Sequence, residues 1–95
     1  MLLEGYDLVE KEVIADYHFP SEEVLTREAD TQEREKALKR AISLGNLEHQ
    51  KVRIYFVDDQ GQKVVETTIW GITDQAILLK RNVRIPINRI SKLEI

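Results

Sequence analysis

The chain has 95 residues, 42% hydrophobic and 33% charged, with a net charge of −3, a composition that fits one folded domain and excludes a disordered or fibrous chain. It contains no cysteine, which excludes disulfides and thiolate zinc sites and favours a reducing compartment. The sequence has no run of roughly 18 apolar residues and no basic, apolar leader at its start, so we expect a cytoplasmic protein without membrane contact.

Charge is distributed unevenly along the chain. Residues 1–30 contain two basic and nine acidic residues, a net charge of −7, whereas residues 31–95 contain twelve basic and eight acidic residues, a net charge of +4. Such asymmetry indicates either a surface for nucleic acid or a protein partner, or an acidic face exposed to solvent.

Residues 1–20 form an acidic N-terminal arm whose pattern is ambiguous. Apolar residues recur at helical spacing, at Leu2, Tyr6, Val9, Val13 and Tyr17. Residues 13–19 also alternate as in a strand, and Pro20 ends either element because proline disfavours helical backbone in the residue before it. We favour a strand over about 12–19.

Residues 21–95 are predicted to form a single domain of helices followed by strands. Ser21 supplies a hydroxyl cap followed by two carboxylates, which predicts a helix over about 21–29. Asp30 and Glu33 form a second capping pair, and an apolar stripe predicts a helix over 31–44 that Gly45 ends.

Residues 51–95 are predicted to form five short strands. Alternating apolar residues begin at Val52, a turn with Gly61 follows, and a long strand over 64–73 is expected to bend at Gly71. Residues 76–79, 84–87 and 92–95 complete the set. Seven residues are expected to be buried together: Val52, Ile54, Phe56, Ile69, Leu78, Ile85 and Ile87.

A helix followed by a five-strand meander resembles the SH3-like small barrels, in particular the Sm-like arrangement. The resemblance implies an α+β fold with one or two N-terminal helices packed on a five-stranded barrel over 51–95. It also implies single-stranded RNA binding and ring assembly through the fourth and fifth strands. The Sm-like RNA-contacting motif is Asp-x-x-x-Asn, and this chain has Asp74-Gln75-Ala76-Ile77-Leu78 at that place, without the asparagine.

The same layout is similar to that of the Rho-binding antiterminator proteins, small barrels that act by binding another protein. Segments such as 44–46, 65–70 and 85–90 also resemble a family of small uncharacterised bacterial proteins, a resemblance that implies no activity.

No catalytic or metal-binding pattern is present in the sequence. His18 and His49 each stand alone, without a nucleophile or the spacing of metal ligands, and Asp58 and Asp59 lie in a predicted turn. We therefore expect no catalytic residues, no metal, no cofactor and no small-molecule substrate, and predict that the protein is not an enzyme. A cleft enclosing His49 with Asp58 or Asp59 would be the first sign of one.

One set of residues forms a candidate binding face of aromatic and basic side chains. Tyr55 is expected to share an outward strand face with Lys51 and Arg53, which combines base stacking with phosphate neutralisation. The full set is Lys51, Arg53, Tyr55, Trp70, Lys80, Arg81, Arg84 and Arg89.

A structural alternative exists for each member of this face. Tyr55 would be covered by the N-terminal arm or a helix, Trp70 would fill the barrel mouth, and the basic residues would block unwanted strand pairing. We favour these alternatives for the two aromatic residues. The sequence thus predicts a non-enzymatic binding module that acts through protein–protein contacts, self-association included. The alternative is binding of single-stranded RNA or other nucleic acid through the basic and aromatic face.

Overall fold

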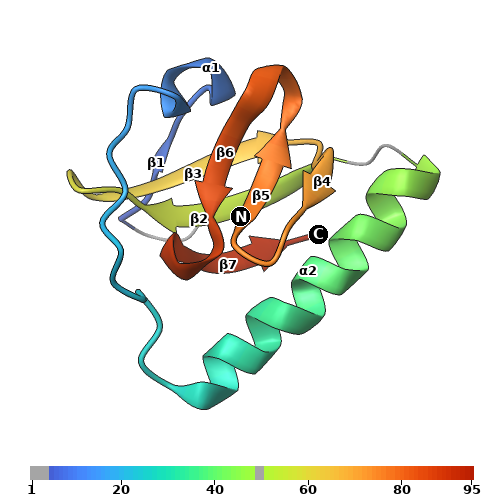
Figure 1. Cartoon of the computed structure of the whole chain (residues 1–95), viewed down its shortest axis with the longest axis horizontal. Coiled ribbons are helices and arrows are strands. Elements are labelled where there is room, and N and C mark those ends of the chain that lie inside the picture. The colour runs from blue at the N-terminus through green and yellow to red at the C-terminus, as the bar shows by residue number, and fades with distance from the viewer. Residues whose placement is uncertain (1–4, 49–50) are drawn as a thin grey trace.

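Two β-sheets face each other in the computed structural model, which describes residues 5–48 and 51–95 (Figure 1). The first sheet has the order β1-β3-β2-β7, formed by Asp7–Leu8, Gln62–Thr67, Val52–Val57 and Ile90–Glu94. The second has the order β4-β5-β6, formed by Gly71–Ile72, Ala76–Leu79 and Val83–Pro86. Over the described residues both sheets are open, so the fold is α+β with two sheets and no closed barrel.

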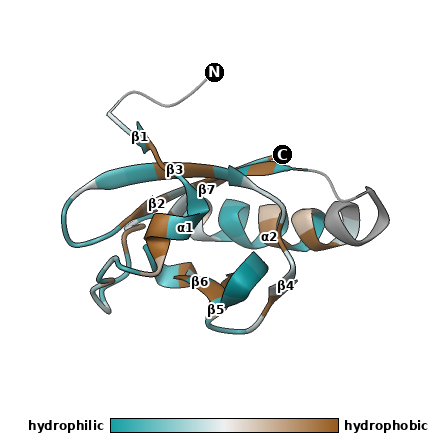
Figure 2. Cartoon of the chain, turned by 90° about the horizontal axis from the view of Figure 1, so that it is seen from above, coloured by the Kyte–Doolittle hydropathy of each residue, from teal (hydrophilic) through white to brown (hydrophobic). Residues whose placement is uncertain are grey.

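Two α-helices lie at opposite ends of the space between the sheets (Figure 2). Helix α1, Lys11–Ile14, contacts β3 of the first sheet and β6 of the second, and helix α2, Glu28–Glu48, contacts β7 and β4. Each helix therefore bridges the two sheets and covers apolar side chains that the open edges leave uncovered. Neither helix has the length and apolar character needed to cross a membrane.

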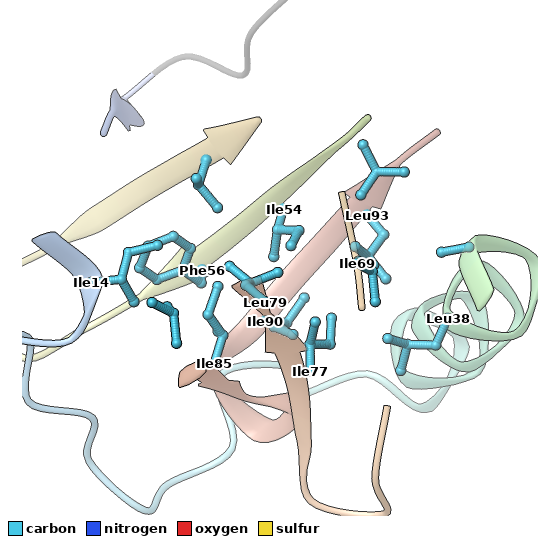
Figure 3. Close-up of a cluster of buried hydrophobic side chains, with 14 residues drawn as sticks. Ile14, Leu38, Ile54, Phe56, Ile69, Ile77, Leu79, Ile85, Ile90 and Leu93 are labelled. Carbon is cyan, nitrogen blue, oxygen red and sulfur yellow. The ribbon is translucent and has the colours of Figure 1, made fainter. Parts of the chain in front are cut away.

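The core lies between the inner faces of the two sheets (Figure 3). Ile14 from α1 enters it on one side and Leu38 from α2 on the other. Ile69 comes from the crossing between the sheets, and most of the remaining members come from the strands, namely Val52, Ile54, Phe56, Val65, Ile77, Leu79, Val83, Ile85, Ile90 and Leu93. The expected burial of Val52, Ile54, Phe56, Ile69 and Ile85 is confirmed.

Two members of the expected core are placed differently. Leu78 points away from the core, and its neighbours Ile77 and Leu79 are buried instead. A strand shifted by one residue presents its other face, so the prediction for this strand had the wrong phase. Ile87 is only partly buried, because it begins the 3₁₀ turn η2, Ile87–Arg89, instead of continuing a strand.

The N-terminal arm is part of the fold, but not as the expected strand. Strand β1 pairs with β3 in parallel, and residues 11–14 form one helical turn that places Ile14 in the core while Val13 stays exposed. The expected alternation fails at Val13 and Ala15, which are exposed, and only its later members Tyr17 and Phe19 pack on the core. The rings of Tyr17 and Phe19 contact Phe56, with centroids 6.3 and 5.9 Å from its ring.

The helix expected over 21–29 does not form as such, because its backbone hydrogen-bonds to turn η2. The side-chain amide of Asn88 donates to the carbonyl of Ser21 at 2.6 Å, and Arg89 Nη1 donates to that of Glu22 at 2.8 Å. The Val24 N–H donates to the Asn88 carbonyl at 2.9 Å. These tertiary bonds replace helical ones, so a single helix begins at Glu28. It includes the expected residues 31–44 and continues past Gly45 to Glu48.

The long strand expected over 64–73 is two strands in different sheets. Strand β3 ends at Thr67 in the first sheet and β4 begins at Gly71 in the second, so the chain crosses between sheets over 68–70. The backbone of Gly71 lies outside the left-handed region, and Gly71 begins β4 directly after the change of sheet. The three residues before it make the crossing.

Candidate functional site

The outer face of the second sheet carries the candidate site. Because Ile77 and Leu79 point inward, Leu78 between them points outward. Leu78 pairs with Arg84 on β6 and with Gly71 on β4, so its side chain lies between a long cationic side chain and a residue without one.

Trp70 is held beside this face at the crossing between the sheets. The backbone N–H of Trp70 donates to the carbonyl of Leu78 at 2.9 Å, and the residue is 63% exposed. Lys80 Nζ lies 5.8 Å from the centre of the Trp70 ring, within the range of a cation–π contact. The expectation that Trp70 fills a barrel mouth is therefore wrong. Ile69, the residue before it, enters the core instead.

The turn after β5 supplies further cations. Residues Lys80–Asn82 form the short turn η1, in which Arg81 and Asn82 have φ angles of 65° and 62°. Asparagine tolerates this left-handed conformation, whereas for arginine it costs about 1–2 kcal/mol. The fold thus places a strained arginine at the tip of an exposed hairpin.

Together these residues form an open groove of about 620 Å³, which we call the tryptophan groove. The residues that define it are Trp70, Thr73, Leu78, Lys80, Arg81 and Arg84. No acidic side chain lines it among the described residues. Over residues 5–48 and 51–95, no carboxylate lies within ion-pair distance of Lys80, Arg81 or Arg84. An apolar floor flanked by three cations is suited to a ligand with both apolar and anionic groups.

A second hollow, of about 550 Å³, lies on the other side of Trp70 and Lys80. Lys51 lines it, together with the exposed Leu8 from β1. The carboxylate-bearing residues Glu10, Glu12 and Glu66 also line it, so its charge is mixed. The structure therefore separates Lys51 from the groove by the Trp70 and Lys80 side chains.

Two members of the predicted face, Arg53 and Tyr55, make contacts within the first sheet and with the N-terminal arm. Arg53 forms ion pairs with Glu66 at 3.1 Å and with Glu94 at 3.0 Å. Tyr55 is fully buried, which confirms that the N-terminal arm covers it. The ring of Tyr6 packs edge-on against it at 5.2 Å. Neither residue offers a free surface group to a ligand.

Arg89 is also unsuited to ligand binding. It is 7% exposed, and its guanidinium donates to the carbonyls of Val57 at 2.9 Å and Glu22 at 2.8 Å. It therefore ties the 21–27 segment to the sheets. Of the eight predicted residues, the structure brings four together in one groove: Trp70, Lys80, Arg81 and Arg84.

The residues considered for catalysis lie elsewhere. His18 is exposed, and its carbonyl accepts a hydrogen bond from the Asp59 N–H at 3.0 Å, while His49 lies outside the described residues. Asp58 is buried in its turn, where Oδ1 accepts from Lys63 at 2.7 Å and from the N–H groups of Gln60 and Gly61. Within the described ranges, no three His, Cys, Asp or Glu side chains gather as metal ligands.

Burial by itself would raise the pKa of Asp58. The hydrogen bonds from Lys63 and from the two backbone N–H groups outweigh burial, so the pKa lies below its ordinary value. An enclosed carboxylate whose pKa is lowered by these hydrogen bonds stabilises the turn and is not placed to accept a proton from a substrate.

Comparison of the chain with protein-family models, with curated proteins and with solved structures finds no match in any of the three.

Leu78 and Thr73 line the groove but were not part of the predicted face, and Leu78 is the apolar one of the two. The alternation of strand 76–79 contains no polar residue, so its phase cannot be determined from the pattern alone. The flanking residues give the one local signal for this site. Lys80 and Arg84 lie on either side of a short hairpin turn, and Trp70 directly precedes Gly71.

Proposed function

We propose that this domain is a non-enzymatic binding module that acts through protein–protein contacts, with the tryptophan groove as its contact surface. The observation that carries the proposal is the 63% exposure of Trp70 next to three cations without carboxylate partners among the described residues. Tryptophan and arginine are enriched among the residues that dominate protein–protein binding energies.

The composition of the groove supports this function. Leu78 forms an apolar centre, and the charged ends of Lys80, Arg81 and Arg84 surround it. An apolar centre with a polar rim is the usual anatomy of a protein interface. A groove of about 620 Å³ accommodates a short segment of a partner, not a whole domain face.

We further infer that the two sheets together form an open small barrel of the SH3-like, Sm-like type. The strand order β7-β2-β3 continues through the crossing at 68–70 into β4-β5-β6, and η2 joins β6 to β7 by a single turn. Counting β3 with β4 as one interrupted strand gives the five-strand meander that the sequence predicts. The lack of cysteine supports a cytoplasmic location.

Binding of single-stranded nucleic acid is the second candidate function. Trp70 offers a ring for base stacking, and the cations of the same groove offer contacts to phosphate. Protein binding ranks first because Tyr55 and Arg53, the other half of the predicted nucleic-acid face, are engaged within the fold. The chain as a whole also carries a net charge of −3.

Site-specific photo-crosslinking in the native cell tests the function. A photoreactive phenylalanine derivative placed at Trp70 keeps an aromatic group in the groove, and one placed at the exposed Lys39 on α2 serves as control. We expect position 70 to capture a discrete species that protease digests and nuclease leaves intact. A second copy of this chain would count as such a partner.

Two outcomes would contradict the proposal. Crosslinked material at position 70 that nuclease removes would replace it by the nucleic-acid function. Identical products from positions 70 and 39 would show that the groove makes no specific contact.

A further inference from the structure

We infer that the tryptophan groove recognises an acidic segment of its partner that also carries an aliphatic or aromatic side chain. The inference rests on the proposed function and specifies its ligand. The occupant is a short stretch of protein in which one apolar side chain contacts Trp70 and Leu78, while carboxylates on either side contact the cations.

The charge of the groove is complementary to that of an acidic ligand. Lys80 and Arg81 lie at the hairpin tip and Arg84 on β6, so cations flank the floor on two elements. Arginine binds carboxylates through two parallel N–H donors, which gives direction as well as attraction. With no carboxylate among the lining residues, the missing charge is supplied by the ligand.

The apolar floor of the groove, formed by Leu78, is suited to an apolar side chain of the ligand. A Cβ built on Gly71 would lie 3.6 Å from Leu78 Cδ1, an ordinary contact, and the backbone at Gly71 has no left-handed φ. A side chain at position 71 is thus sterically allowed, and its absence leaves Leu78 open to the groove. A half-buried leucine that lines a groove beside an exposed tryptophan is an apolar anchor site of the kind found at interface centres.

The backbone conformation of Arg81 also supports a role in ligand binding. A residue with φ of 65° favours glycine or asparagine, and an arginine there lowers stability. The side chain at this position projects from the tip of the turn, beside Lys80. Such strain is common where a residue serves binding instead of folding.

The surroundings favour an acidic peptide over a polynucleotide. The second hollow beyond Trp70 and Lys80 offers no continuous basic path, because Glu10, Glu12 and Glu66 line it together with Lys11 and Lys51. A sequence-independent single-strand site also needs several stacking rings along a basic path. Here Tyr55 is buried, so Trp70 is the ring that the groove offers.

Selection from a random dodecapeptide display library tests the inference with the intact protein as bait. We expect the selected peptides to be enriched in aspartate and glutamate beside leucine, isoleucine or phenylalanine. Selection of basic peptides, or of peptides without charge bias, would overturn the inference. Tighter binding of an oligouridine strand than of any selected peptide would overturn it as well.

Selected peptides are then titrated while the fluorescence of Trp70, the only tryptophan of the chain, is recorded. We expect a blue shift that saturates, and dissociation constants raised about tenfold by Arg84→Gln, the loss expected for one charge-assisted hydrogen bond. The matched control is Lys39→Gln, an exposed cation on α2, which should leave affinity unchanged. Equal effects of the two substitutions would overturn the inference.

The experiments distinguish failure of the acidic-ligand inference from failure of the proposed binding function. If position 70 crosslinks a protein but the selected peptides are not acidic, the binding function stands and the acidic ligand is wrong. If position 70 crosslinks no protein, the proposed function itself is wrong.

Discussion

Lys80 Nζ lies 5.8 Å from the centre of the Trp70 ring, and this pair separates two hollows of different charge. One hollow has three cations and no carboxylate among its described lining residues, and the other is lined by three glutamates together with Lys11 and Lys51. The Trp70 and Lys80 side chains thus divide the tryptophan groove, which has only cationic charged residues, from a hollow of mixed charge.

Arg81→Gly should stabilise the fold and weaken binding. Glycine removes the strain of the left-handed backbone, about 1–2 kcal/mol, against an entropic cost of about 0.5–1 kcal/mol. We expect the free energy of unfolding in urea to rise by up to about 1 kcal/mol while affinity for an acidic peptide falls. A variant that loses both stability and affinity would show that Arg81 has a structural role.

Gly71→Val should close the groove without changing its charge. The added side chain would lie over Leu78, and β-branched residues favour strands. Peptide affinity should fall, with the unfolding midpoint unchanged or raised. Undiminished affinity would show that ligands do not reach the Leu78 floor.

The strand phase at residues 76–79 predicts unequal effects of neighbouring substitutions. Ile77→Ala should lower the free energy of unfolding by ~2–5 kcal/mol, the range for truncation of a buried aliphatic side chain. Leu78→Ala should cost less, about 1 kcal/mol, because the side chain is half-buried on the outer face. Chemical denaturation of both variants measures these two changes in the free energy of unfolding. A larger decrease for Leu78→Ala than for Ile77→Ala would show that Leu78, not Ile77, faces the core.

The arm is testable with another pair of neighbours. Ile14 is 1% exposed in the core and Val13 is 41% exposed on the same helical turn. Ile14→Ala should cost ~2–5 kcal/mol, whereas Val13→Ala should stay within ~0.5 kcal/mol of wild type. Equal, small losses in urea unfolding would mean that the arm does not contribute to the core.

An ion pair links the 21–27 segment to α2 and predicts a pH dependence. Arg34 is buried and donates to both carboxylate oxygens of Glu23, one bond being 2.8 Å, and to the Ile90 carbonyl at 2.9 Å. The hydrogen bonds from Arg34 outweigh burial and hold the pKa of Glu23 below its ordinary value of 4.5.

Because the pKa is lowered in the folded state, this stabilisation is present above the ordinary pKa and is lost as pH falls through the folded one. Wild type should therefore lose stability as the pH falls below about 4.5, and Glu23→Gln should lose less. At neutral pH Glu23→Gln should already be less stable, by roughly 1 kcal/mol, because the half-exposed carboxylate is screened. Glu33→Gln, at an exposed site on α2, should match wild type in its acid response. An acid response of Glu23→Gln equal to that of Glu33→Gln would refute the role of the pair.

The elements that the sequence predicted well are those with a clear local signal. The polar and apolar alternation of Val52, Ile54 and Phe56 placed β2, and the Asp58 to Gly61 turn placed the hairpin. Local signals failed where tertiary bonds replaced them. Ser21 and Glu22 carry a helix-start pattern, yet their carbonyls accept bonds from Asn88 and Arg89, which are more than 60 residues away.

The candidate site was predictable in part for a related reason. Lys80, Arg81 and Arg84 are close in sequence, so a hairpin brings them together. Arg53 and Arg89 look equally available in the sequence, but their partners Glu66, Glu94 and the Val57 carbonyl come from other strands. Pairing across strands depends on register, which the sequence pattern does not specify.

The most direct test of the central claim locates the bound ligand on the protein. Amide chemical shifts of isotopically labelled protein, recorded while a selected acidic peptide is added, report which residues meet it. The account predicts shifts concentrated at 70–73 and 78–84, with α2 and the Tyr55 side of the first sheet unaffected. Shifts centred on β2 and β7, or spread evenly over the chain, would contradict it.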